Sequence, residues 1–166
     1  KLYLGERHMD IMGPCRNSAV LVENFIPSDG RLLGILAVPK PDGQTLAIKG
    51  SGILNLTDTM ENGFVYFDLP EGAYRLFILF TTRTGGGRDH YMNLIDSSSV
   101  KVLLDEVYEK HYARYSKYFG NVIAGFFSDE PELGNVKGYP FDNMLGQKDI
   151  RLPWSDELER KLTETW

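Results

Sequence analysis

The sequence predicts an α/β chain: a fragment of a (β/α)8 (TIM) barrel with an antiparallel, β-rich insertion or accessory portion. Three observations lead to this prediction. Short apolar runs between glycine-containing turns fill the first half, apolar side chains recur at helical spacing over residues 97–119, and an apolar run at 122–127 ends in an acidic cluster. We therefore expect a β-rich portion over residues 1–88 and a barrel portion over residues 89–166.

The first half is expected to be mostly antiparallel β structure. Strands are predicted at about 19–26, 32–38, 45–49, 63–67 and 73–81. The turns between them each end in a glycine, which tolerates positive φ: Ser28-Asp29-Gly30, Pro41-Asp42-Gly43, Glu61-Asn62-Gly63 and Pro70-Glu71-Gly72. A glycine-rich loop at 84–88 then separates the two portions.

Two helices are expected in the second half. Asp96 or Ser97 can cap a helix over residues 97–119, and Gly120 supplies its left-handed stop. After a mostly irregular stretch, a short amphipathic helix is expected to begin near Ser155.

A buried strand is expected between these helices. Residues 122–127 are apolar on both faces, as in a parallel sheet, and Pro131 cannot continue the strand. The acidic residues that follow the run would then lie at the C-terminal end of the strand. Barrel enzymes hold their catalytic groups at that end.

The composition excludes several classes of function. The 166 residues, of which 42% are hydrophobic, suffice for about one domain with an ordinary core. The net charge of -5, with scattered Lys and Arg, argues against a nucleic-acid partner. No apolar run approaches the roughly 18 residues of a membrane helix, so no membrane partner is expected. The single Cys15 excludes an internal disulfide and a cysteine-rich metal site.

No cofactor and no metal are predicted. His8 and Asp10 have a plausible spacing for two metal ligands but lack a third. Glycines 85–87 are not followed by the Lys-Ser/Thr pair of a phosphate-binding loop. His111 lies among tyrosines on the apolar side of the predicted helix, and we interpret it as a packing residue.

Several stretches of the second half together resemble one family. They are Tyr91-Met92-Asn93-Leu94-Ile95-Asp96-Ser97, the helix end Tyr118-Phe119-Gly120, the run from Val122 to Glu132, and Leu152-Pro153-Trp154-Ser155. The combination, over about residues 90–160, resembles large bacterial glycoside hydrolases with a (β/α)8 catalytic barrel. The resemblance implies that the strand ending at Asp129-Glu130 is a middle barrel strand and that Glu130 is the proton donor. The family's commonest pattern has Asn where this chain has Asp129.

The chemistry of glycoside hydrolysis accounts for these residue types. One carboxylic acid protonates the leaving oxygen while a second carboxylate acts on the opposite face of the sugar. Glu130 is the predicted acid, and like charges on Asp129 and Glu132 are expected to raise its pKa. Asp129 and Glu132 are also predicted to bind substrate. In the alternative interpretation, all these acids belong to a solvated loop at a strand end.

Two further substrate-binding residues are predicted after the glycine-rich loop. Tyr91 can stack on the face of a sugar ring, and Asp89 can bond sugar hydroxyls. A plain loop without function is the alternative interpretation for both residues.

The chain is expected to be part of a longer polypeptide. It opens at Lys1 without an initiator methionine and stops within a helical pattern at Trp166, and a complete barrel takes about 250 residues. The expected partners are therefore a carbohydrate substrate and the remainder of the parent polypeptide, which would supply the second carboxylate. Exposed strand edges could also pair copies of the chain. The location in the cell is left open, with the cytoplasm favoured, and the sugar, the linkage and the stereochemical outcome are not predicted.

A noncatalytic module is the competing hypothesis. In it, the first half is a carbohydrate-binding or structural β-rich module, and the acids near Glu130 are surface residues. It predicts a self-contained sheet, with sugar binding through aromatic residues of the first half that Glu130→Gln leaves unchanged.

Overall fold

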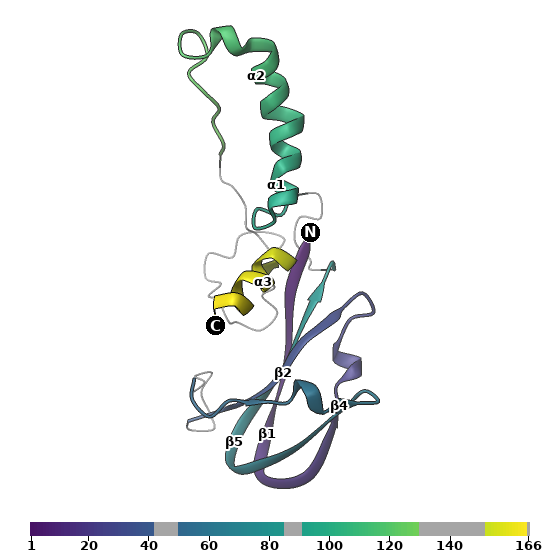
Figure 1. Cartoon of the computed structure of the whole chain (residues 1–166). Helices are drawn as coiled ribbons and strands as arrows, with labels where there is room; N and C mark the ends of the chain where they lie inside the picture. The colour runs from purple at the N-terminus through teal and green to yellow at the C-terminus, as the bar shows by residue number, and fades with distance from the viewer. Residues whose placement is uncertain (42–49, 85–90, 130–151, 166) are drawn as a thin grey trace.

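The strands that the structure describes form an antiparallel sheet, around which the chain folds (Figure 1). The computed structural model describes residues 1–41, 50–84, 91–129 and 152–165. Within these residues the strands are β1 (Leu2–Leu21), β2 (Arg31–Pro39), β3 (Leu54–Asn55), β4 (Met60–Glu61), β5 (Phe64–Thr82) and β6 (Leu152–Trp154). They are ordered β3-β2-β5-β1-β6, and β4 pairs with one end of β5. Residues from the far end of the chain, in β6, thus extend the sheet formed by the first half.

The predicted fragment of a (β/α)8 barrel is wrong. All pairings between the described strands are antiparallel, and together these strands form a half-barrel sheet. Residues 122–127, predicted as a buried strand, contribute only an isolated bridge from Phe119 to Ile123. Val122 is 79% exposed and Phe127 is 89% exposed, whereas a barrel strand is buried on both faces. A short apolar run indicates burial but does not by itself specify a strand partner.

Two long strands dominate the sheet. β1 and β5 pair from Tyr3 opposite Thr82 to Leu21 opposite Phe64, with irregularities in the register between Gly13 and Ser18. Such bulges bend a strand and increase its twist. The sequence predicted two strands and a turn at Pro70-Glu71-Gly72, but that tripeptide lies inside β5, where Gly72 has φ +138°.

The bend in β5 keeps one face of the strand buried along its whole length. Buried side chains occupy odd positions before the bend and even positions after it, because the tripeptide at 70–72 shifts the alternation by one residue. These inward-facing residues are Val65, Phe67 and Leu69, then Tyr74, Leu76, Ile78 and Phe80. They form the core with Val22, Ile35, Ala37 and Leu56.

The local turn and strand predictions in the first half have mixed outcomes. The strand at 32–38 is confirmed as β2, and the turn at Glu61-Asn62-Gly63 is confirmed between β4 and β5 by positive φ at Asn62 and Gly63. The predicted strand at 19–26 stops at Leu21, and residues 23–25 form the 3-10 helix η1 (Glu23–Phe25). A second 3-10 turn, η2 (Thr57–Thr59), precedes β4. The predicted strand at 45–49 lies outside the described residues.

The helix predicted over 97–119 is confirmed as one continuous helical segment. It consists of α1 (Ser97–Leu103), a π-helical turn η3 (Leu104–Tyr108), α2 (Glu109–Tyr115) and a 3-10 turn η4 (Ser116–Tyr118). Asp96 caps its start by accepting a hydrogen bond from the Ser98 N–H at 3.1 Å. Gly120 follows with φ +84°. A last helix, α3 (Asp156–Thr165), confirms the predicted amphipathic helix.

The helical segment extends away from the sheet (Figure 1). Its apolar side is covered in part by Phe126, whose ring lies 4.5 Å from the ring of Tyr108, centroid to centroid. Tyr112 and Val102 on the same segment stay exposed. The sequence pattern of a core helix is therefore present, while the described chain supplies little for it to pack against.

A charge network joins three strands on the outer side of the sheet. The Asp10 carboxylate on β1 accepts hydrogen bonds from Arg75 Nε of β5 at 2.8 Å and from Lys40 Nζ, just after β2, at 2.6 Å. The Lys40 and Arg75 side chains are only 4% and 10% exposed, whereas Asp10 is 49% exposed. The hydrogen bonds from Arg75 and then Lys40 hold the pKa of Asp10 well below its usual range.

Asp10→Asn is expected to lower the free energy of unfolding by about 2 kcal/mol at neutral pH, because the buried cations Lys40 and Arg75 lose their anion. The loss is limited because Asp10 is partly exposed and solvent screens its charge. A carboxylate with a lowered folded-state pKa stabilises the fold above its ordinary pKa of 3.8 and loses that contribution as the pH falls further. The difference in urea-unfolding free energy between wild type and Asp10→Asn should therefore shrink below about pH 4. Asp58→Asn, at an exposed acid, is the control; a difference independent of pH would contradict the assignment.

Candidate functional site

Two stretches about 60 residues apart in the sequence meet at one end of the sheet. The Asn93 side-chain N–H donates to the Trp154 carbonyl at 2.7 Å, and the Ser155 hydroxyl donates to the Ile95 carbonyl at 2.7 Å. β6 anchors this junction because Leu152–Trp154 pairs with Leu2–Leu4 of β1. The stretches at 91–97 and 152–155, quoted above for the family resemblance, are therefore parts of one structural unit.

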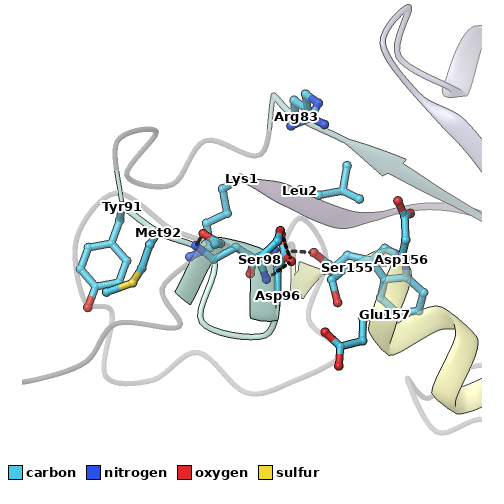
Figure 2. Close-up of a pocket in the computed structure, with 13 residues that line it drawn as sticks. Lys1, Leu2, Arg83, Tyr91, Met92, Asp96, Ser98, Ser155, Asp156 and Glu157 are labelled. Carbon is cyan, nitrogen blue, oxygen red and sulfur yellow. Dashed lines mark hydrogen bonds between the residues drawn. The ribbon is translucent and has the colours of Figure 1, made fainter. Parts of the chain in front are cut away.

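A cavity of about 390 Å³ opens at this junction, and we call it the junction cavity (Figure 2). Charged, hydroxyl and amide groups make up most of its wall, together with two aromatic rings. The lining residues are Lys1, Leu2, Arg83, Tyr91, Met92, Asn93, Asp96, Ser98, Ser99, Trp154, Ser155, Asp156 and Glu157. The volume falls within the range of about 300–1,000 Å³ typical of small-molecule sites.

Two carboxylates hold the start of α1 at the wall of the cavity. Asp96 accepts from the Ser98 N–H and also from the Ser98 hydroxyl at 2.7 Å. Glu157 accepts from the Ser97 hydroxyl at 2.6 Å and from its N–H at 3.3 Å. The hydrogen bond from the Ser97 hydroxyl is the largest cause of a lowered pKa of Glu157. The hydrogen bond from the Ser97 N–H and the ion pair with Lys161 lower this pKa further. Glu157 is therefore ionised at neutral pH.

The start of α3 forms another part of the wall. Ser155 caps this helix, since its hydroxyl accepts from the Leu158 N–H at 3.0 Å. The Trp154 indole N–H donates to Glu159 at 3.1 Å, and Glu159 in turn pairs with Arg31 of β2 at 2.6 Å. The hydrogen bond from Arg31 lowers the pKa of Glu159. Trp154 is thus fixed in orientation between the sheet and α3.

Asn93 contributes a buried amide side chain to the wall of the cavity. It is 5% exposed, and its backbone N–H donates to the Ser99 hydroxyl at 2.9 Å. Its Nδ2 is used by Trp154, but its Oδ1 has no hydrogen-bond partner in the part of the chain that the structure describes. An unpaired buried acceptor costs about 1–3 kcal/mol, so such groups merit a functional explanation.

The predicted site residues fall in different places. Tyr91 lines the junction cavity, with Lys1 Nζ 5.7 Å from the centre of its ring. Asp129 is exposed and does not line that cavity. The other predicted residues, Glu130, Glu132 and Asp89, lie outside the described residues, so the structure does not place the predicted acid.

Sequence reasoning missed several groups of the cavity. The sequence indicated Asn93 and Trp154 only as parts of resembling stretches, and Asp96 only as part of such a stretch and as a possible helix cap. Glu157 carried no signal of its own, because an acid in the first turn of a helix is common for electrostatic reasons. Only the combination of the two stretches, which the fold brings together, could have indicated a shared site.

Other kinds of site find little support in the described residues. In that part of the chain no three His, Cys, Asp or Glu side chains are placed to hold a metal ion. The pair of His8 and Asp10 is used otherwise, since His8 contacts Glu6 and Asp10 contacts Arg75. None of the helices found there has both the length and the apolar character needed to cross a membrane.

Comparisons with known proteins add no further evidence. No protein-family model, no curated protein and no solved structure matches this chain. The resemblance to glycoside hydrolases therefore rests on the quoted residues alone.

Proposed function

We propose that this chain is part of a glycoside hydrolase that cleaves O-glycosidic bonds, with Glu130 as the general acid and the second carboxylate outside the chain. The observation that carries the proposal is the junction cavity. Tyr91, expected from the sequence to contact a sugar, lines it together with Trp154 and three carboxylates. Sugar sites combine aromatic rings, which cover the apolar faces of a pyranose, with polar groups that bond its hydroxyls.

Glu157 of the cavity wall suits binding more than proton donation. Glu157 has a lowered pKa, and an ionised carboxylate accepts hydrogen bonds from hydroxyls but has no proton to give. A general acid needs a raised pKa so that it stays protonated near neutral pH. In this proposal Glu130, within the acidic run Asp129-Glu130-Pro131-Glu132, supplies the proton, and the cavity holds a sugar unit.

The proposal predicts activity only in a longer polypeptide. The 166-residue chain and a version extended by its natural flanking sequence would be assayed on a panel of aryl glycosides. Turnover is expected for the extended protein and not for the chain alone, because hydrolysis needs two carboxylates and one lies outside. Turnover by the chain alone would show that its site is complete, and an extended protein that is folded but inactive on every glycoside would reject the function.

A noncatalytic carbohydrate-binding module is the second candidate, and one observation favours it. The described part of the first half forms an antiparallel sheet over a buried core, to which β6 of the second half adds a short strand. In this case the extended protein would bind glycans without cleaving them, and Glu130→Gln would leave the binding unchanged.

A further inference from the structure

We propose that the junction cavity is a subsite for one uncharged sugar unit and that its carboxylates select against acidic sugars. The inference rests on the proposed function for the class of ligand and names where and how that ligand is held. Its basis is the wall of the cavity around Asn93, Tyr91 and Glu157.

The first step is the unused acceptor. Asn93 is 5% exposed, lines the cavity, and keeps its Oδ1 without a partner among the described residues. Its amide is held in place because Nδ2 already donates to the Trp154 carbonyl. This oxygen is shielded from solvent, so a sugar hydroxyl bonds it only when the cavity wall around Asn93 shifts as the sugar binds.

The second step is the sign of the charge. Among the described residues that line the cavity, three are acidic, Asp96, Asp156 and Glu157, and two have cationic side chains, Lys1 and Arg83. Figure 2 shows Arg83 at the margin of the group, whereas Asp96 accepts from Ser98 and Glu157 accepts from Ser97 at the start of α1. Ionised oxygens accept strong hydrogen bonds from neutral hydroxyls, but they repel the carboxylate of a uronic acid.

The third step is the ring surface. Tyr91 is half-buried and lies at one side of the side chains drawn in Figure 2, two residues before Asn93, which bonds the Trp154 carbonyl of β6. Stacking on an aromatic ring covers the apolar face of a pyranose while its hydroxyls stay free to meet the polar wall. The cavity therefore offers both kinds of contact that a single sugar unit requires.

The test measures the binding of sugars to the 166-residue chain. Binding is monitored through the NMR chemical shifts of the Trp154 indole and the Asn93 side-chain amide. The probes are the methyl glycosides of glucose, galactose and mannose, and glucuronic and galacturonic acid. Saturable binding of at least one neutral glycoside is expected, with the uronic acids weaker by about 3- to 10-fold. Tyr91→Ala should weaken the binding by about tenfold, and Tyr66→Ala, at an exposed tyrosine outside the cavity, should not.

Glu157→Gln provides the decisive variant, because it removes a charge and keeps the shape of the side chain. It should bring the affinities for the uronic acids and the neutral glycosides closer together. An absence of saturable binding, an equal loss in Tyr66→Ala, or an unchanged preference in Glu157→Gln would each overturn the inference. Failure of this inference can be distinguished from failure of the proposed function. A folded extended protein that hydrolyses no glycoside would reject the function, while sugar binding to this cavity could still be measured.

Discussion

Glu130→Gln in the extended protein is expected to lower kcat by about 10²- to 10⁴-fold on glycosides with poor leaving groups. Glutamine keeps the size of the side chain but cannot donate a proton to the departing oxygen. The loss should be much smaller on dinitrophenyl glycosides, because their leaving group departs without protonation. Steady-state kinetics on both kinds of substrate would measure the difference.

Glu71→Gln is the matched control for this variant, since Glu71 is an exposed acid at the bend of β5. Its kcat should equal that of the wild type on all substrates. A loss in Glu130→Gln that is the same for good and poor leaving groups would indicate a role in binding or folding, and no loss at all would remove Glu130 from the mechanism.

Local signals in the sequence were sufficient for the helical segment and for one hairpin. Asp96 caps a helical segment that ends at Tyr118, two residues before Gly120, and the apolar spacing within it is set by the helix alone. The turn at Glu61-Asn62-Gly63 needs two residues that accept positive φ, and Asn followed by Gly is the strongest short-range signal for it. Both features depend on residues close together in the chain.

Most of β1 and the junction cavity, which depend on distant partners, could not be predicted, although β2 was. The first 18 residues of the chain alternate poorly, because Arg7 and His8 are neighbours within β1. They nevertheless form a strand through pairing with β5 some 50 to 80 residues later. The opposite error occurred at residues 122–127, whose apolar character suggested a strand that no described partner completes. The polar wall of the junction cavity has the same origin, since Asn93 and Trp154 become neighbours only in the fold.

Gly13→Ala is expected to destabilise the protein by about 3 kcal/mol or more, at or above the usual cost of overpacking. Gly13 lies opposite Gly72, where β1 and β5 bend together. A Cβ atom at position 13 would lie 1.8 Å from the carbonyl oxygen of Pro70 and 3.2 Å from Cβ of Leu69. Because the nearest atom belongs to the backbone, side-chain rotation cannot relieve the clash, and the two strands would have to separate.

Urea unfolding of Gly13→Ala beside Gly50→Ala measures this cost against a matched control. A Cβ at Gly50 would meet no atom of the described residues within 4 Å, so Gly50→Ala should change the unfolding free energy by less than about 0.5 kcal/mol. Separation of the strands at the bend would also shift the register that keeps Leu69 and Tyr74 on the same buried face of β5. Equal stability of the two variants would mean that β1 and β5 do not approach each other closely at Gly13 and Pro70. The strand register described for the bend would then be wrong.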